Sequence, residues 1–269
     1  MKRFLIALQF LTILPVKHKM TVNTADIAKS SSFFVVVGLL QGMMLIATDY
    51  IAGRVFHPDL VTGIVLLVYV VSNGGLHLDG LADTFDAIAA TPEDNPEADK
   101  QKRLSVLKDP STGPAGVTSI LFSLGLKYLS LNSLANFLPF TYYSSLLFLP
   151  VIPKWTMVVS MYHGRRAREN GLGSIFIRQI GLKEVAVSTI ILFLLFVLPQ
   201  LFFSDYIPDN QYIFYAVLLI SMYSLCRIWI QFFHKKFGGL TGDMLGAVSE
   251  MTEVTFLLMV ILWSRFSLY

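Results

Sequence analysis

The sequence predicts an all-α protein in which a bundle of helices crosses a membrane several times, and composition and hydropathy both support this fold class. Hydrophobic residues make up 54% of the 269 residues and charged residues only 14%, whereas soluble domains carry about 25% charged residues. The mean hydropathy is +0.62, and the apolar residues are gathered in runs close to the roughly 20 residues that a helix needs to cross a bilayer. No polar stretch is long enough to fold separately, so we expect one domain over residues 1–269.

Seven segments have the length and composition of spanning helices. They lie at residues 33–53, 60–78, 115–134, 141–161, 184–203, 211–232 and 245–265. Each is expected to be helical because a backbone in lipid has to satisfy its own hydrogen bonds. Residues 4–14 form an earlier apolar stretch that is too short to span and is followed by no cleavage site of small residues. We therefore expect a polytopic bundle of six to seven spans, preceded by a short re-entrant or interfacial helix.

The basic residues are distributed unevenly between the two sides of these spans. If the chain up to residue 32 lies inside and the spans alternate, fourteen basic residues lie inside: Lys17, Lys19, Lys29, Lys100, Lys102, Arg103, Lys108, Arg165, Arg166, Arg168, Arg178, Lys183, Lys235 and Lys236. Only Arg54 and Arg265 lie outside. Because basic residues are enriched in cytoplasmic loops, the asymmetry predicts which side faces the cytoplasm. The net charge of +3 is too small to indicate a nucleic-acid partner.

Three aspartates follow the second expected span, in the string from His77 to Asp86. Asp79, Asp83 and Asp86 are spaced i, i+4, i+7, which places them on one face of a helix. Stacked carboxylates repel one another unless a cation lies among them, and Mg²⁺ or Mn²⁺ takes oxygen ligands. The alternative is a solvated acidic helix end, but acids near membrane depth are usually functional. The pattern predicts a divalent metal site.

A second acidic group opens the last span. Asp243 and Glu250 are two helical turns apart, and Glu253 follows at i+3. Glu250 and Glu253 lie in an otherwise apolar helix, so they need a metal, a cationic partner or a proton. The alternative to a metal is a structural pair with a buried arginine such as Arg227. Nearby glycines would let a backbone or a substrate approach closely: Gly238, Gly239, Gly242 and Gly246.

Two turns rich in basic residues are expected on the same side of the membrane. In the first, Arg103 and Lys108 precede a turn with Gly113 and Gly116 that begins a helix, which suits a phosphate cradle. In the second, the residues indicate a shaped loop: Arg165, Arg166, Arg168 and Asn170. Either turn alone is equally compatible with lipid headgroups. Together with the two acidic groups, they predict a phosphoryl-group transferase that binds metal and pyrophosphate.

Four strings of this sequence, in order along the chain, closely resemble the bacterial cobalamin synthase family. They are Gly75-Leu-His-Leu-Asp-Gly-Leu-Ala-Asp83, Leu107-Lys-Asp109 with Gly113 and Gly116, Arg168-Glu-Asn-Gly-Leu-Gly173, and Gly242-Asp-Met-Leu-Gly-Ala247 with Glu250. The resemblance runs from Phe4 to about Leu262. It implies a Mg²⁺-dependent enzyme of the bacterial inner membrane, with Mn²⁺ as a substitute ion and the active site facing the cytoplasm. The implied reaction joins adenosylcobinamide-GDP to α-ribazole or its 5′-phosphate in late cobalamin assembly and releases GMP.

The resemblance and the chemistry together assign roles to residues of this sequence. The expected metal ligands are Asp79, Asp83, Asp86, Asp243 and Glu250. Asp86 or Glu250 would serve as general base, and Lys108 is expected to act on the transferred phosphate. The expected substrate-binding residues are His77, Arg103, Lys108, Arg165, Arg166, Arg168 and Asn170. Departures from the family pattern at Ala87 and at Ser111-Thr112 affect only local details of the loops.

The assigned roles depend on one contact, because the two acidic groups are far apart in the sequence. The second and last spans must pack against each other to make them one site. Beyond the substrates and membrane lipid, the sequence leaves open a homo-oligomer or an association with other cobalamin-assembly enzymes.

Other function classes make different predictions. A CDP-alcohol phosphotransferase also places spaced aspartates at helix ends, but its signature has an Ala-Arg pair, whereas Ala82 is followed by Asp83. A secondary transporter would carry acids near the bilayer midplane and show two related halves, and no internal repeat is visible. A non-catalytic scaffold would have no reason to keep so many acids near lipid.

Overall fold

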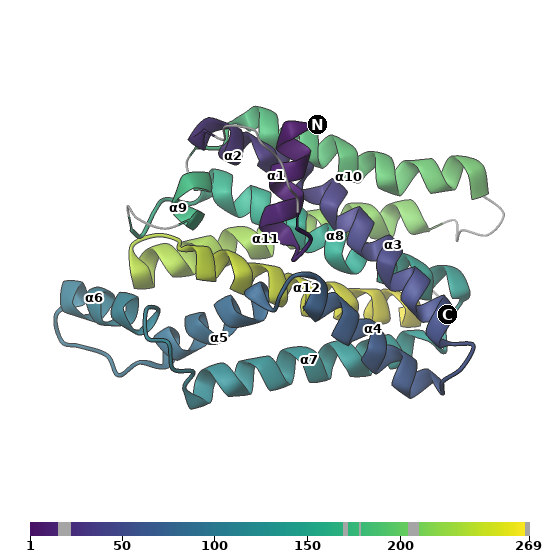
Figure 1. Ribbon diagram of the computed structural model, residues 1–269, viewed down its shortest axis with the longest axis horizontal. Coiled ribbons are helices and arrows are strands. Elements are labelled where there is room, and N and C mark those ends of the chain that lie inside the picture. Colours follow the sequence, from purple (N-terminus) through teal and green to yellow (C-terminus); the bar gives the residue numbers. More distant parts are fainter. Residues whose placement is uncertain (16–22, 169–171, 178, 204–209, 267–269) are drawn as a thin grey trace.

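The computed structural model describes residues 1–15, 23–168, 172–177, 179–203 and 210–266 as a bundle of helices (Figure 1). The helices are α1 (Lys2–Leu11), α2 (Thr24–Ser30), α3 (Phe34–Ala52), α4 (Pro58–Ser72), α5 (Leu76–Ala89), α6 (Pro96–Val106), α7 (Pro114–Leu134), α8 (Pro139–His163), α9 (Leu172–Phe176), α10 (Leu182–Phe203), α11 (Gln211–Phe237) and α12 (Gly242–Phe266). Helices α4, α6, α7 and α8 each begin with a proline, whose fixed φ and missing N–H suit the first helical position. The predicted all-α fold class is confirmed.

Six helices among the described residues are long and apolar enough to cross a membrane. They match six of the seven expected spans: Thr24–Ala52, Pro114–Leu134, Pro139–His163, Leu182–Pro199, Gln211–Phe237 and Gly242–Phe266. The first is a single segment because the short 3₁₀ turn Ser31–Phe33 joins α2 to α3. The multi-pass architecture is therefore confirmed.

The remaining expected span, residues 60–78, is not one straight helix. Helix α4 ends at Ser72, and α5 leaves it at an angle of 85°. The turn contains Gly74 with φ +63° and Gly75 with φ +70°, a conformation that side chains with a Cβ rarely adopt. The aspartates therefore lie along a separate helix, and the count of spans reaches seven only if this bent pair is one broken span.

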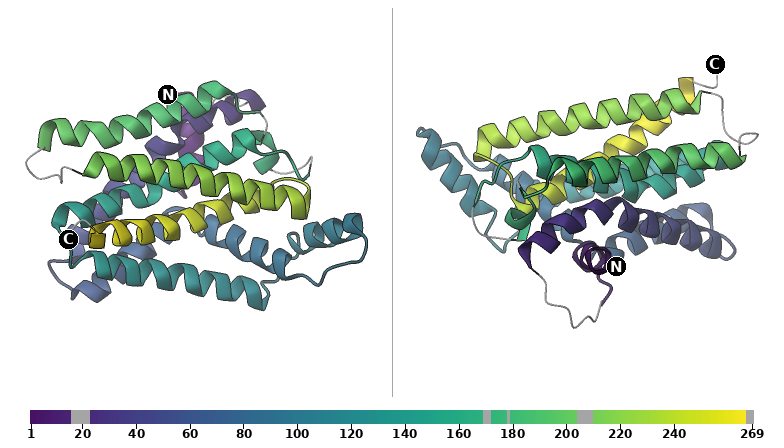
Figure 2. Two further views of the ribbon diagram at one scale, coloured as in Figure 1. Left: turned by 180° about the vertical axis from the view of Figure 1, so that it is seen from behind. Right: turned by 90° about the horizontal axis from the view of Figure 1, so that it is seen from above.

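Helix α8 is the central element of the bundle. In its most apolar window 89% of the residues are buried, and Figures 1 and 2 show the other long helices arranged around it, roughly parallel to one axis. Helix α3 approaches α8 at backbone contact, since a Cβ on Gly42 would lie 2.2 Å from the Leu147 carbonyl oxygen. Small residues at such crossings let two helices pack closely within a membrane.

One end of the bundle carries the additional short elements. Helices α6 and α9 and the start of α12 lie at the left-hand end of Figure 1. Helix α1 runs across the direction of the long helices and is seen end on in the right panel of Figure 2. The expected short N-terminal helix is therefore present, and its crosswise direction is that of an interfacial helix.

Candidate metal and phosphate site

Helices α5 and α12 cross in backbone contact, which places the two acidic groups side by side. A Cβ on Gly80 of α5 would lie 2.5 Å from the Asp243 carbonyl oxygen, and one on Gly246 of α12 would lie 3.2 Å from the Cα of His77. Only glycine permits this approach at Gly80, because any side chain would overlap the neighbouring backbone. The predicted packing of the last span against the aspartate-bearing segment is confirmed.

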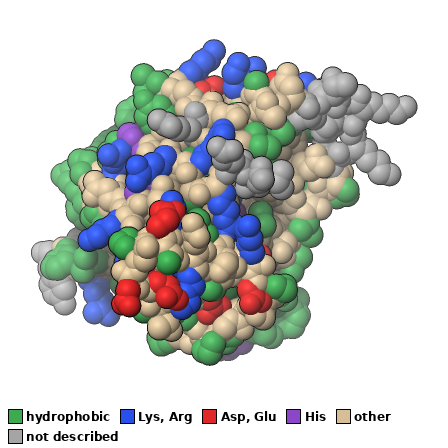
Figure 3. All heavy atoms as spheres, turned by 90° about the vertical axis from the view of Figure 1, so that its left-hand side faces the viewer, with side chains coloured by type: hydrophobic (Ala, Val, Ile, Leu, Met, Phe, Trp, Pro, Cys, Tyr) green, Lys and Arg blue, Asp and Glu red, His purple; other side chains and the backbone are tan. Residues whose placement is uncertain are grey.

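The crossing gathers four aspartates at one end of the molecule. The charges of Asp79, Asp86 and Asp243 all act on the carboxylate of half-buried Asp83, and Asp79 is exposed. Within the described part of the chain, no hydrogen bond or ion pair engages the carboxylate of Asp79 or Asp83. Figure 3 views this end of the molecule and shows acidic side chains gathered in its lower part, with Lys and Arg side chains around and above them.

The donor chemistry of this group fits a divalent cation. Four carboxylates that repel one another, of which Asp79 and Asp83 have no ion pair within the described residues, offer the oxygen ligands that a hard divalent ion prefers. No three of them bring ligand oxygens within 4.8 Å of one another, a spacing that the described residues show only for His77, Glu250 and Glu253. The looser arrangement suits Mg²⁺, which keeps several waters and is commonly held by one or two carboxylates together with substrate phosphates. Asp79, Asp83 and Asp243 are the residues that would hold it.

Asp86 has a second function that its spacing does not reveal. Its carboxylate accepts hydrogen bonds from the backbone N–H groups of Gly113, at 2.7 Å, and Gly116, at 2.8 Å. These N–H groups lie at the N-terminus of α7, so Asp86 caps that helix and interacts favourably with its dipole. A Cβ on Gly113 or Gly116 would come within 2.6 Å of the carboxylate. The expected phosphate cradle at this helix start is therefore wrong, because a protein carboxylate takes these donors.

Arg103 holds two helices together, contrary to its expected role in substrate binding. Its side chain is only 3% exposed and donates to the carbonyl oxygens of Ala87 and Ile88 at the end of α5. It also pairs with Asp99 at 2.9 Å, and this hydrogen bond lowers the pKa of Asp99. Through these bonds of Nε and Nη1, the guanidinium ties α6 to the C-terminal end of the aspartate helix. Lys108, at the end of α6, is exposed.

The second basic turn lies against the N-terminus of α12. The backbone N–H of Leu240 donates to the Arg165 carbonyl at 2.7 Å, and that of Ala167 donates to the Leu240 carbonyl at 3.0 Å. This pairing requires Gly239, where a Cβ would lie 2.5 Å from the Ala167 nitrogen. The glycines near α12 therefore admit protein backbone, one of the two occupants that the sequence left open.

The arginines of this turn differ in what they contact. Arg165 is exposed, and Arg166 donates to the carbonyl of Ile177 at 3.1 Å. Arg168 donates to the carbonyl of Leu104; burial lowers the pKa of Arg168, and the charge of Asp243 opposes that shift. Asn170 lies outside the described residues. The turn thus brings Arg168 close to an aspartate of the site.

A cavity of about 400 Å³ adjoins the aspartate group. Its lining includes His77 of α5, Arg168 of the second basic turn, and Asp243 and Gly246 of α12, and it is completed by Phe10 of α1 and by Leu107, which follows α6. The volume is within the range of small-molecule sites. Apolar walls with one cation and one acid suit a ligand that has both a ring and an anionic group.

Glu250 does not join the aspartates but belongs to a separate cluster inside the bundle. Lys127 lies 2.7 Å from Glu250 and 2.8 Å from Glu253, and all three side chains are at most 2% exposed. Ser123 donates to Glu250, and Tyr69 donates to Glu253, each at 2.7 Å. The partner proposed from the sequence, Arg227, is wrong, because the cation that pairs with these glutamates is Lys127.

Two lysines of the cluster were not predicted as functional residues, although a lysine inside an apolar run of spanning length is an unusual feature of the sequence. Lys127 and Lys154 each lie within an expected span, where a charge is costly and usually functional. Lys154 is fully buried in α8 and its Nζ lies 3.4 Å from Nδ1 of His77. We call Tyr69, His77, Lys127, Lys154, Glu250 and Glu253 the intramembrane cluster. A ring nitrogen of His77 and carboxylate oxygens of both glutamates lie within 4.8 Å of one another, but the ammonium of Lys127 already pairs with both acids.

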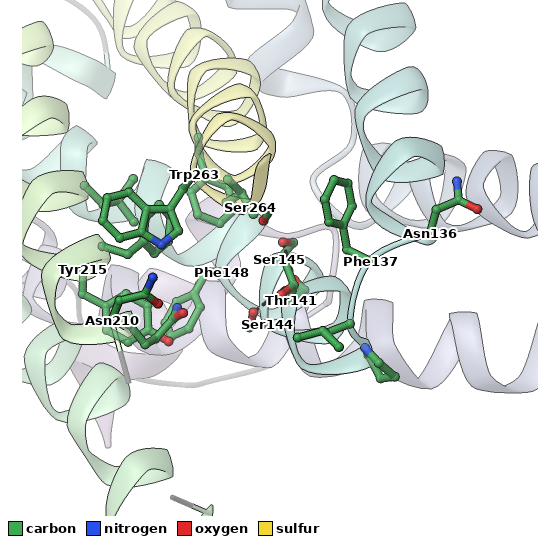
Figure 4. A pocket seen from close by; sticks show the side chains of 17 residues that line it. Asn136, Phe137, Thr141, Ser144, Ser145, Phe148, Asn210, Tyr215, Trp263 and Ser264 are labelled. Carbon is green, nitrogen blue, oxygen red and sulfur yellow. Dashed lines mark hydrogen bonds between the residues drawn. The ribbon is translucent and has the colours of Figure 1, made fainter. Parts of the chain in front are cut away.

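A larger cavity, of about 630 Å³, lies at the opposite end of the bundle. Figure 4 shows its lining, in which aromatic side chains such as Phe148, Tyr215 and Trp263 face hydroxyl and amide groups. Among the described residues, no charged side chain lines it. The described part of its lining therefore supplies neither carboxylates for a metal nor cations for a phosphate.

Comparisons with known proteins cover almost the whole chain. Residues 3–261 match the family model described as cobalamin-5-phosphate synthase. A curated adenosylcobinamide-GDP ribazoletransferase from Thermodesulfovibrio yellowstonii is 34% identical, with 98% of this chain and 97% of the relative covered. Proteins of the same name from Acetivibrio thermocellus and Geotalea daltonii are 35% and 32% identical, covering 98% and 97% of this chain and 98% and 97% of the relatives, respectively. No solved structure matches.

Proposed function

The chain belongs to the cobalamin-5-phosphate synthase family, and we propose that it acts as an adenosylcobinamide-GDP ribazoletransferase. The observation that carries the proposal is the crossing of α5 and α12, which joins Asp79, Asp83 and Asp243 beside a cavity that also contains Arg168. Transfer of a phosphoryl group from a nucleotide-activated substrate requires carboxylates that bind a metal and a cation that binds phosphate, all at one place.

The proposed reaction transfers the cobinamide phosphate to a nucleoside hydroxyl. A ribose hydroxyl of α-ribazole, or of its 5′-phosphate, attacks the phosphorus bonded to cobinamide. The bond from that phosphorus to the bridging oxygen of the pyrophosphate breaks, GMP leaves with the electron pair, and the proton of the attacking hydroxyl passes to water or to the departing phosphate. A bound Mg²⁺ would neutralise charge on the pyrophosphate oxygens. The chain's own residues then have to orient the two substrates, and the candidate cations are Arg168, whose charge acts on Asp243, and the exposed Arg165 and Lys108.

We propose further that the site faces the cytoplasm across the bacterial inner membrane. The support is the asymmetry of basic residues, since the helix ends that carry the aspartates share their side with the basic loops. That side is also where soluble nucleotide substrates are found.

Reconstituted protein tests the proposal directly. Protein in lipid nanodiscs with Mg²⁺, adenosylcobinamide-GDP and α-ribazole should release GMP and form a complete corrinoid. Asp83→Asn should lower the rate by about 100-fold or more, because it removes a ligand from the charge-neutralising site. The matched control is Asp59→Asn, which removes an exposed carboxylate at the start of α4 and should keep the wild-type rate.

Two outcomes would contradict the proposal. One is a wild-type rate of GMP release in folded Asp83→Asn protein. The other is the absence of GMP release with any divalent ion while CMP is released from a CDP-activated alcohol.

A further inference from the structure

The intramembrane cluster connects the two helices that carry the aspartates to the rest of the bundle. Glu250 and Glu253 come from α12 and His77 from α5, while Lys127 comes from α7, Lys154 from α8 and Tyr69 from α4. Lys127 bridges the two glutamates at 2.7 and 2.8 Å. Tyr69 donates to Glu253 at 2.7 Å, and Lys154 approaches His77 at 3.4 Å. Five helices therefore meet at one polar point.

The cluster lies deep within the bundle and is balanced in charge. Glu250 is eight residues from the start of α12, and Lys154 is nine residues from the end of α8, which places both roughly 12 to 14 Å below the acidic end. Lys127 pairs with both glutamates and the charge of Lys154 acts on both as well, so two lysines accompany two glutamates. At this depth any single unpaired charge would be costly.

The cluster and the metal site share the same two helices. On α12, Glu250 stands two turns beyond Asp243, and on α5, His77 precedes Asp79 by two residues. The helices touch at Gly80, which meets the backbone of Asp243, and at Gly246, which meets the backbone of His77. The rotation of α12 about its own axis decides whether Asp243 faces Asp79 and Asp83. Two sets of contacts fix this rotation: the glycine contact with α5 and, further along α12, the ion pairs with Lys127.

From this arrangement we infer that the intramembrane cluster positions the metal site: the Lys127–Glu250–Glu253 ion pairs hold α12 in the rotation that aligns Asp243 with Asp79 and Asp83. Glu250 is then a positioning residue, neither a metal ligand nor a general base. The inference rests on the proposed function insofar as that function requires a metal at the aspartates. It assigns new roles to Lys127, Lys154, Tyr69 and Glu253, which the comparisons do not describe.

Charge balance provides a sharp test. Lys127→Met leaves two carboxylates facing one ammonium group, whereas Lys127→Met with Glu250→Gln restores one of each. Mn²⁺ binding, measured by electron paramagnetic resonance on protein in lipid nanodiscs without substrates, reports on the aspartates independently of turnover. Lys127→Met should weaken Mn²⁺ binding by about tenfold or more, because small displacements of ligands are costly. The double variant should recover Mn²⁺ binding and GMP release to within about threefold of wild type, the coupling expected of directly interacting residues.

A pair of tyrosine variants separates positioning from general loss of stability. Tyr69→Phe removes the hydrogen bond to Glu253, while Tyr142→Phe removes another buried bond, 2.6 Å long, to Asp49 between α3 and α8. Both should lower thermal stability to a similar degree, but only Tyr69→Phe should weaken Mn²⁺ binding.

Each result bears on a different claim. If wild-type protein binds no Mn²⁺, the proposed metal site fails. If it binds Mn²⁺ and folded Lys127→Met binds it equally well, the positioning role is wrong. If the double variant binds Mn²⁺ normally but releases no GMP, Glu250 takes part in the reaction itself and the inference is overturned.

Discussion

Asp83 and Asp86 are carboxylates on the same helix, one turn apart, yet the structure gives them different surroundings. Asp83 faces three other aspartates and has no hydrogen-bond partner within the described part of the chain. Asp86 accepts two backbone hydrogen bonds from the start of α7. Asp86 remains a predicted metal ligand through its other lone pairs, but a loss of function on its substitution would combine two causes.

Replacing each aspartate by asparagine should separate these roles. Without metal, Asp83→Asn should leave the melting temperature unchanged or raise it, because it relieves repulsion among the acids. Asp86→Asn cannot accept both N–H groups and should cost about 1 kcal/mol, or about 2 °C in melting temperature. Thermal unfolding in detergent with a chelator measures both. A larger loss of stability in Asp83→Asn than in Asp86→Asn would show that the assignment of roles is reversed.

At the scale of elements, the site depends on the backbone contact between α5 and α12. Neither helix alone brings together more than one acidic group, and the contact exists because Gly80 has no Cβ. The bend at Gly74 and Gly75 contributes as well, because it turns α5 by 85° away from the axis of α4. Arg103 then secures the far end of α5 against α6.

Two glycine-to-alanine substitutions test the importance of this contact. Gly80→Ala places a Cβ 2.5 Å from the Asp243 carbonyl, so it should cost about 1–3 kcal/mol through overpacking and should lower GMP release by about tenfold or more as the acids separate. Gly125→Ala in α7 meets no neighbouring atom within 4 Å and should be neutral or stabilising by up to about 1 kcal/mol. Thermal unfolding and initial rates of both variants measure the difference. Equal behaviour of the two variants would mean that the close crossing is dispensable.

The whole molecule is polarised along the direction of its long helices. One end carries the aspartates, the basic turns and α6 (Figure 3), and the other carries an uncharged cavity lined by aromatic residues (Figure 4). In a bilayer this polarity determines the side on which water-soluble substrates can react.

Cysteine labelling in intact cells tests the orientation. The natural cysteine, Cys226, is buried and should stay unlabelled. Asn136→Cys, exposed just after α7 at the end opposite the aspartates, should react with a membrane-impermeant maleimide added outside. Ser111→Cys, exposed near the acidic end, should react only after the membrane is permeabilised. The opposite labelling pattern would place the proposed active site outside the cytoplasm.

Some features could be predicted because they depend on neighbours along the chain. The spanning helices follow from apolar runs of membrane length, and the shared face of Asp79, Asp83 and Asp86 follows from helical periodicity. Two further features were also visible in the sequence. The Asn-Gly-Gly string marks the bend after Ser72, and lysines within apolar runs mark the buried Lys127 and Lys154. These signals say that something unusual occurs at a position, but they do not identify the partner.

The roles of Asp86, Arg103 and Glu250 could not be predicted, because they depend on residues that are distant along the chain. Their partners, Gly113 and Gly116, the carbonyl oxygens of α5, and Lys127, come from other helices, and in the last case from 123 residues away. By itself, the sequence determined the all-α membrane fold, the side with the basic loops and the aspartates that suit a metal. Only the tertiary structure decided which charged groups remain available at the site, because burial leaves a charge stable only where another helix supplies its counter-charge or hydrogen bonds.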